Sequence, residues 1–250
     1  MISPKIDFVK IMHKEQSNNS LKELLKMTEV KSKLIEAEFI ASQLFEAIEN
    51  RRLITPGKSE NELNEDIFKL ADELYGIKKY WHKRIVRSGV NTLVPYDDNP
   101  PNLVIQQDDI LFLDFGPILE EWEADFGRTY VIGADPFKHK LKHDIELAWH
   151  EAKAWFDKQT RLTGAEFWFY IVDLAKKYGY EYGGQLGGHL IGHFPHERLN
   201  PKDYGLYVHP ENPNDMFLPD AIGNKRDWIL EIHFVDRERQ IGGFFEQLLT

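Results

Sequence analysis

Residues 109–133 read DILFLDFGPILEEWEADFGRTYVIG. Within this stretch, residues 110–115 and 130–132 are rich in β-branched and aromatic side chains, which predicts two short strands. Asp114 lies inside the first run, and Asp125 follows it eleven positions later. That separation is long enough for a hairpin that brings the two carboxylates together.

Two more carboxylates lie in strand-like runs near the end of the chain. Glu231 lies within residues 228–234 and Glu246 within residues 243–249. Because apolar side chains occupy both faces of these runs and of the run around Asp114, we expect these three acids to be buried. An ionised carboxylate that is removed from water is costly unless it is paired, protonated or bound to a metal.

The four acids carry more charge than their sequence neighbours can neutralise, since Arg128 is the only cation close to Asp125. If the acids converge, two divalent cations would balance their charge. His189, which lies on a glycine-rich bend, would then complete a set of oxygen and nitrogen ligands suited to Mn, Co, Fe or Zn. For any one acid taken alone, a strand end or an ion pair is the simpler interpretation. Four acids together favour the metal site.

The overall composition excludes several classes of protein. The chain has 250 residues, of which 42% are hydrophobic and 29% charged, as is typical of a folded globular protein. A net charge of −10 argues against a nucleic-acid partner. We find neither an apolar run long enough to span a bilayer nor a secretion signal, and we predict a cytoplasmic protein without a membrane partner. The absence of cysteine excludes disulfides, thiolate nucleophiles and zinc–thiolate sites.

Helical periodicity indicates that several helices accompany these strands. One helix is predicted over residues 136–159. Capping boxes predict three further helix starts, at Ser20 with Glu23, Ser59 with Glu62, and Thr163 with Glu166. We therefore expect one α/β or α+β domain, with residues 1–54 as a helical lead-in packed on residues 55–250.

The residues around the acids resemble a known family. The M24 metallopeptidases, the superfamily of methionine aminopeptidases and Xaa-Pro aminopeptidases, share the ligand order Asp, Asp, His, Glu, Glu. The matching segments are Asp114-Phe-Gly116, Asp125-Phe-Gly-Arg-Thr-Tyr-Val-Ile-Gly133, Gly188-His-Leu-Ile-Gly192, His196-Glu197, Glu231 and Glu246. The resemblance implies an α+β pita-bread fold, in which helices cover a curved antiparallel sheet of pseudo-twofold symmetry around a dinuclear metal site. It makes residues 55–250 the metallopeptidase catalytic domain.

The resemblance also implies a role for each matching residue. Asp114 would chelate one metal ion, and Asp125 and Glu246 would bridge both ions. His189 and Glu231 would complete the coordination of the other ion. Glu231 would in addition be the general base or proton shuttle. His196 would bind the substrate peptide and stabilise the tetrahedral intermediate. The implied activity is cleavage of the N-terminal peptide bond of a small peptide, with the Xaa-Pro type as one option. A homodimer is one assembly that we consider for the chain.

Two positions depart from the family pattern. Tyr96 stands eighteen positions before Asp114, where family peptidases carry a histidine, and Gln185 stands where the Xaa-Pro branch carries another. Because the reference pKa of tyrosine is about 10, Tyr96 is a poor proton carrier near neutrality, which puts peptidase efficiency in doubt. We assign Tyr96 to the substrate pocket together with His193, for which a hydrogen-bonded place inside the loop is an equal alternative. His82, in the preceding segment, has the alternative of folding back into the site, but its spacing does not require this, and a surface or packing role is expected.

The departures leave two alternatives to an aminopeptidase. One is a homologue with altered catalysis that serves as a peptide-binding or protein-binding module, because Tyr96 and Gln185 replace family histidines. The other is a hydrolase of a non-peptide C–N bond, as in creatinase. All five ligand positions match the family, which favours the peptidase.

Overall fold

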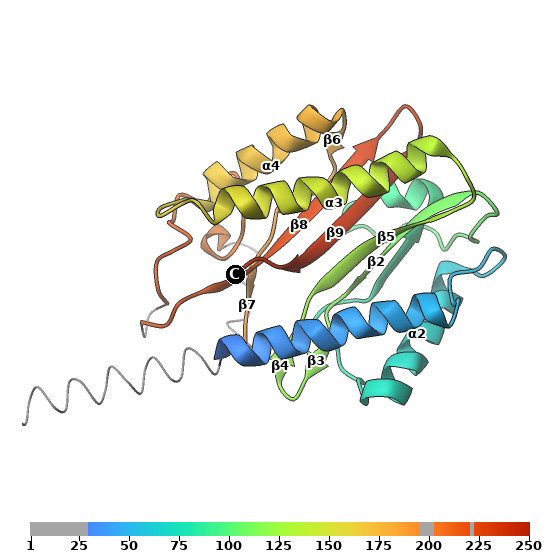
Figure 1. The fold of residues 1–250 in the computed structure, drawn as a ribbon, viewed down its shortest axis with the longest axis horizontal. Coiled ribbons are helices and arrows are strands. Elements are labelled where there is room, and N and C mark those ends of the chain that lie inside the picture. Colours follow the sequence, from blue (N-terminus) through green and yellow to red (C-terminus); the bar gives the residue numbers. More distant parts are fainter. Residues whose placement is uncertain (1–29, 196–202, 221–222) are drawn as a thin grey trace, which may run out of the picture.

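The computed structural model describes residues 30–195, 203–220 and 223–250. Its main sheet has seven strands in the order β1-β2-β5-β9-β8-β6, with β7 paired to β8, and all of its pairs are antiparallel (Figure 1). Two short strands, β3 and β4, form a separate hairpin. The strands are β1 (Ile85–Ser88), β2 (Asp109–Phe115), β3 (Ile118–Leu119), β4 (Trp122–Glu123), β5 (Phe126–Ile132), β6 (Glu181–Tyr182), β7 (Leu190–Ile191), β8 (Asp227–Asp236) and β9 (Ile241–Leu248).

Two helices begin where their capping boxes predict. In α2 (Glu60–Tyr75) and α4 (Gly164–Tyr178) both capping boxes are formed, by Ser59 with Glu62 and by Thr163 with Glu166. Residues 30–50 form an N-terminal helix, and the box predicted at Ser20 and Glu23 lies outside the described residues. The remaining helices are α3 (Pro136–Phe156), η1 (Gly89–Leu93) and η2 (Tyr204–Leu206). Among the described residues, no helix is long and apolar enough to cross a membrane.

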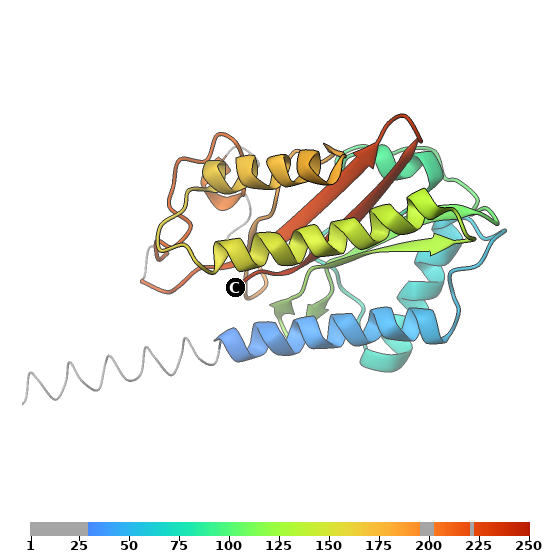
Figure 2. The same ribbon diagram turned by 45° about the horizontal axis from the view of Figure 1, so that its top comes forward.

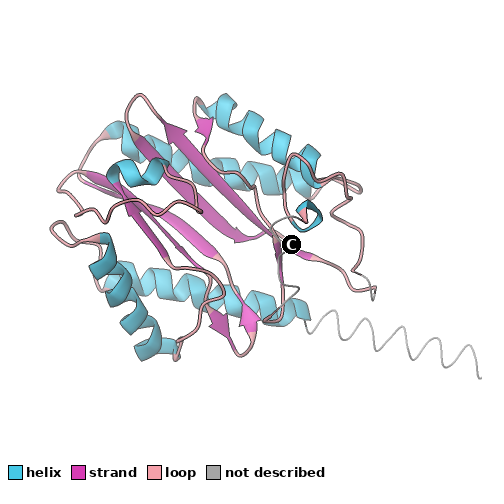
Figure 3. Ribbon diagram, turned by 180° about the vertical axis from the view of Figure 1, so that it is seen from behind, coloured by secondary structure: helices cyan, strands magenta, loops and turns pink. Residues whose placement is uncertain are grey.

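The sheet consists of two halves, each covered by its own helices. The N-terminal helix and α2 bury a core against β1, β2 and β5, while α3 and α4 bury a second core against β8 and β9 (Figures 1 and 2). Seen from behind, the strands lie in front of the N-terminal helix and α3, so these helices share one face of the sheet (Figure 3). The pseudo-twofold arrangement of helices and strands places β5 and β9 at the junction of the halves.

Candidate metal centre

Three of the predicted acids lie in one row across the sheet. Asp114 on β2 pairs with Gly127 on β5, Gly127 pairs with Glu246 on β9, and Glu246 pairs with Glu231 on β8. Directly opposed residues of antiparallel strands project to the same face of the sheet. The register therefore brings the carboxylates of Asp114, Glu246 and Glu231 to one face. A Cβ atom on Gly127 would lie 2.6 Å from the Phe244 ring, so glycine allows that ring to pack against β5.

The arginine that follows Gly127 on β5, Arg128, projects to the opposite face. The Arg128 guanidinium stacks on the rings of Phe126 and Phe245, at 3.7 and 3.8 Å from their centroids. It also donates hydrogen bonds to the backbone oxygens of Gly127 and Glu246, both at 2.8 Å. Because side chains alternate along a strand, Arg128 is held on the helix-covered face, away from the acids. The charge of Arg87 on β1 lowers the pKa of Asp114, but its guanidinium donates its hydrogen bonds to backbone oxygens of the segment 94–98.

Asp125 and His189 reach the same face from the residues that precede β5 and β7. The His189 Nε2 atom lies 3.0 Å from Asp125 Oδ2 and 3.9 Å from Glu246 Oε1. Gly188 has a φ of +141°, and a Cβ atom there would lie 2.1 Å from the carbonyl oxygen of Ile229. Only glycine allows the chain to approach β8 this closely, and that approach positions His189.

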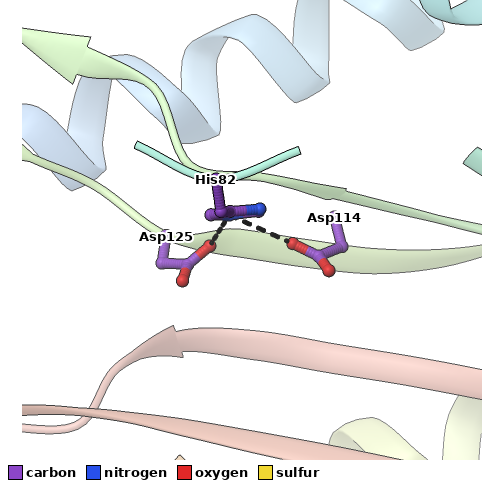
Figure 4. Close-up of side chains that lie close together, drawn as sticks. All are labelled: His82, Asp114 and Asp125. Atoms are coloured by element: carbon purple, nitrogen blue, oxygen red, sulfur yellow. Dashed lines mark hydrogen bonds and ion pairs between the residues drawn. The ribbon is translucent and has the colours of Figure 1, made fainter. Parts of the chain in front are cut away.

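His82 is also part of the cluster, so the expected surface or packing role is wrong. Its Nε2 atom lies 3.0 Å from Asp125 Oδ1 and 3.6 Å from Asp114 Oδ1, and its side chain is 7% exposed (Figure 4). The segment that carries it runs beside the chain after β2, where the Trp81 N–H donates to the Gly116 oxygen at 2.9 Å. A Cβ atom on Gly116 would lie 2.2 Å from the His82 ring, so this glycine makes the approach possible. The contact lies outside the regular strands, and the sequence carries no periodic signal for it.

The side chains form two groups that could hold metal ions. His82, Asp114 and Asp125 form one, and Asp125, His189 and Glu246 form the other, with the candidate ligand atoms of each group within 4.8 Å of one another. Among the described residues, Asp114 Oδ1 and Glu246 Oε2 are buried without a hydrogen-bond partner. Buried carboxylate oxygens without hydrogen-bond partners, beside imidazole nitrogens, fit divalent cations such as Mn, Co, Fe or Zn.

Glu231 stands somewhat apart from these groups. It is half-buried, whereas the other three acids are buried, and it belongs to neither group of candidate ligands among the described residues. Its side chain does line the same pocket. The predicted burial of Glu231 is therefore only partial, and its place suits a group that faces both the cluster and the pocket.

The titration behaviour of the cluster reflects excess negative charge. Burial raises the pKa of Asp114, Glu231 and Glu246, and repulsion among the carboxylates raises it further. Burial also opposes ionisation of Asp125, but the two imidazoles outweigh it and lower the pKa of that carboxyl. Burial opposes protonation of His82, yet Asp125 and Asp114 raise the pKa of its imidazole to about 9. In the absence of cations, the cluster therefore retains protons at neutral pH.

The cluster lies in a pocket of about 720 Å³, a size suited to a small organic substrate. Neither lysine nor arginine is among its lining residues in the described part of the chain. Tyr96 is at the pocket, 45% exposed, with its ring centroid 5.8 Å from that of His82. Burial and the nearby Asp114 raise the pKa of Tyr96 to about 12, so its hydroxyl stays protonated. Gln185 also lines this pocket.

Of the two remaining predicted residues, His193 is not among the described residues that line the pocket. His193 is exposed, with Nε2 3.5 Å from Glu121 Oε2 and its ring 5.2 Å from the ring of Trp122. A β-bridge between His193 and Trp122 fixes this placement, and a role of His193 in substrate binding stays a prediction. His196 lies outside the described residues, and its role also stays a prediction.

Comparison with known proteins gives both a family and a fold. The sequence matches the profile of Metallopeptidase family M24 over residues 32–218. No curated protein sequence is significantly similar to the chain.

Similar solved structures include a recombinant prolidase from Thermococcus sibiricus, with 21% identity and a TM-score of 0.70 over 89% of this chain and 59% of that one. An Xaa-Pro dipeptidase from Bacillus anthracis has 24% identity and a TM-score of 0.69, over 92% and 63% of the two chains. A methionine aminopeptidase from Rickettsia prowazekii has 15% identity and a TM-score of 0.61, over 92% and 97%. The chain thus spans less than two thirds of the first two structures, and the likeness confirms the predicted α+β pita-bread fold.

Proposed function

The chain belongs to metallopeptidase family M24, and we propose that it is a metal-dependent hydrolase that cleaves the N-terminal peptide bond of small peptides. The observation that carries this proposal is the pair of ligand groups that share Asp125 and contain buried carboxylate oxygens without a hydrogen-bond partner among the described residues. Ion pairs with lysine or arginine would have explained the acids without a metal, but no such side chain is among the described residues that line the pocket.

We propose two divalent cations, Mn, Co, Fe or Zn, as cofactors. Asp114 and Asp125 would hold one cation, and Asp125, Glu246 and His189 would hold the other, with Glu231 as a further ligand on that side. Bound cations would lower the pKa of a water molecule and polarise the scissile carbonyl group. The donor set suits these metals because it combines carboxylate oxygens with imidazole nitrogen.

Glu231 is the proposed general base. Without cations, burial and the neighbouring Asp114 raise the pKa of its carboxyl to about 8. A carboxyl whose pKa lies near the working pH can accept a proton and return it during one reaction cycle. It would accept a proton from the attacking water and pass it to the departing amine. The Tyr182 hydroxyl shares its one hydrogen between the Leu186 oxygen at 2.7 Å and the Glu231 backbone oxygen at 3.2 Å, which fixes the strand beneath this carboxyl.

The pocket favours a substrate with a cationic end. Six acidic residues line it, Asp97 and Glu123 in addition to the four of the cluster, without a lysine or arginine among the described lining residues. Two divalent cations would balance four of these charges, and the remaining two would attract the ammonium group of a free peptide N-terminus. The Xaa-Pro type is the first specificity to test, because similar structures include a prolidase and an Xaa-Pro dipeptidase. Gln185, which lines the pocket where that branch has a histidine, argues for a changed preference. The cytoplasmic location and the homodimer stay predictions.

A second candidate is a homologue that binds peptides without cleaving them. Tyr96 supports it, because a hydroxyl whose pKa is raised to about 12 cannot replace imidazole as a proton carrier. Hydrolysis of a non-peptide C–N bond is a third candidate. Hydrolysis of such a substrate without added divalent cations would support this candidate.

The test is hydrolysis of a dipeptide and tripeptide panel that includes Xaa-Pro sequences, with Mn or Co added. We expect turnover by the wild type, loss of about 100-fold or more in kcat for Glu231→Gln, and no change for Glu238→Gln, whose side chain is 86% exposed on the same hairpin. Tight peptide binding without cleavage would support the second candidate. Undiminished turnover by Glu231→Gln would contradict the proposed mechanism.

A further inference from the structure

We propose that His82 is a direct ligand of the cation held by Asp114 and Asp125, in addition to the five residues that follow the family order. The inference rests on the proposed function, because it presupposes that divalent cations bind in this cluster. It assigns a second imidazole to the site, from a segment that the family motifs do not include.

The geometry of His82 repeats that of His189 on the opposite side of one carboxylate. His82 Nε2 lies 3.0 Å from Asp125 Oδ1, and His189 Nε2 lies 3.0 Å from Asp125 Oδ2. Each ring places its Nδ1 atom 2.7 Å from the backbone oxygen of the following residue, Lys83 in one case and Leu190 in the other. His189 occupies the ligand position of the family, so the matching arrangement of His82 indicates a matching task.

The backbone contact determines which nitrogen of His82 faces the cluster as a lone pair. A carbonyl oxygen can only accept, so Nδ1 must carry the hydrogen that it donates to Lys83. In the neutral ring, Nε2 is then unprotonated and points at two carboxylate oxygens, those of Asp114 and Asp125. Three lone pairs that converge in this way attract a cation. Donation of the other ring N–H to a backbone carbonyl is the usual support for a ligating histidine.

The surrounding packing holds this imidazole in place. The Trp81 ring lies edge-on to both imidazoles, with centroid distances of 4.5 Å to His82 and 5.0 Å to His189. The Trp81 indole N–H donates to the Ala124 oxygen at 3.1 Å, next to Asp125. One tryptophan therefore braces both histidines against the segment that carries their shared carboxylate.

The rival arrangement is a protonated His82 that replaces the cation at this position. The imidazolium would then donate one N–H to Lys83 and the other to Asp125, and its positive charge would compensate the acids by itself. In that case the cluster would bind only the cation next to His189. The two arrangements differ in the number of cations bound and in the number of imidazoles attached to them.

The experiment loads the purified wild-type protein with Co(II) and counts both quantities. Elemental analysis after dialysis gives the cobalt content, and titration calorimetry gives the Kd of each site. Proton NMR of the cobalt protein detects one solvent-exchangeable, hyperfine-shifted N–H signal for each imidazole bound through Nε2. We expect two cobalt ions per chain and two such signals, from His82 and His189.

The variant His82→Ala should lose one exchangeable signal and bind the second cobalt ion at least ~100-fold more weakly, since even the loss of a supporting contact costs 10- to 100-fold. The matched control is His150→Ala, which removes an exposed imidazole from α3 and should change neither quantity. One exchangeable signal in the wild type, or unchanged binding of two cobalt ions by His82→Ala, would overturn the inference and leave the proposed function intact. A wild-type protein that binds no cobalt would contradict both the inference on His82 and the proposed metal-dependent function. The wild-type signal count decides the question even if the variant fails to fold.

Discussion

Replacement of Glu246 by glutamine is expected to have opposite effects with and without divalent cations. Glu246 is 2% exposed, and its Oε2 atom has no hydrogen-bond partner among the described residues. Burial, followed by repulsion from Asp125 and Asp114, raises the pKa of its carboxyl well above the ordinary range. Glutamine keeps the shape of the side chain and removes the charge.

The size of the effect follows from the distances in the cluster. The ligand atoms of Asp125 and Glu246 lie within 4.8 Å of each other, where two unit charges repel by about 3.5 kcal/mol at an effective dielectric constant of about 20. If Glu246 instead stays protonated at pH 8, folding must retain a proton that the unfolded chain releases. The free-energy cost of this is about 1.4 kcal/mol for each pH unit above the unfolded pKa, or about 5 kcal/mol at most. Without cations, Glu246→Gln should therefore unfold with a free energy about 3 kcal/mol higher than the wild type at pH 8.

The sign of the pH dependence is a stricter test than the magnitude. A raised pKa in the folded protein means that the folded state retains a proton that the unfolded state has released, so stability falls as the pH rises above about 4.5. At pH 5 the carboxyl of Glu246 is protonated in the folded protein, and the advantage of glutamine should shrink to about 1 kcal/mol or less. With Mn present the order should reverse, because the wild type binds the ions more tightly.

The assay is urea unfolding followed by circular dichroism, at pH 5 and pH 8, with chelator or with Mn. Glu238→Gln is the matched control, because it removes a charge from an exposed side chain of the same hairpin and should stay within about 0.5 kcal/mol of the wild type. A Glu246→Gln protein that is less stable than the wild type in chelator at pH 8 would refute the reasoning, since the carboxylate would then be compensated without cations.

Three further predictions concern Tyr96 in the pocket, Gly188 next to His189, and the protons that the cluster retains without cations. Tyr96→His should raise kcat about 10-fold or more, because it restores an imidazole at the pocket; steady-state kinetics with an unchanged kcat would contradict this role. Gly188→Ala should lower the free energy of unfolding by about 2 kcal/mol or more and lower the metal content. Gly57→Ala is the control, because Gly57 also has a positive φ but lies in open space, and this variant should retain the metal. Thermal melts and elemental analysis measure stability and metal content. Affinity for Mn should increase from pH 6 to pH 9, because His82, with a pKa of about 9, and Glu231, with a raised pKa, release protons when cations bind; calorimetry that gives a flat pH profile would contradict this.

Local chemistry made much of the fold predictable from the sequence. Each capping box within the described residues is formed, because a Ser or Thr side chain and a Glu three residues later satisfy backbone groups that lie next to them. The strand predicted over residues 110–115 corresponds to β2, since its side chains suit a sheet that is buried on both faces. The register of β5 against β9 was not predictable, because it depends on how two separately covered halves meet.

The site was predictable to the extent that burial of charge demands compensation. The acids in apolar runs pointed to a cluster, and the structure brings Asp114, Asp125 and Glu246 together with His189. His82 was missed because its contact with Asp125 arises from a segment without regular structure, which no periodicity marks. Glu231 shows the complementary limit, since its run is as apolar as the others, yet its side chain remains half-buried at the pocket.

The junction between the halves explains why charge compensation and stability are linked in this protein. Among the described residues, β5 and β9 share one paired position, Gly127 with Glu246. Side chains make the rest of the junction, since Thr129 Oγ1 accepts from the Phe244 N–H at 2.7 Å and donates to the Phe244 oxygen at 2.8 Å. Repulsion between Asp125 from one half and Glu246 from the other acts directly across this sparse seam. Cations bound by both carboxylates would replace that repulsion by attraction across the junction. The ions proposed for hydrolysis would therefore also stabilise the packing of the two halves at the pocket.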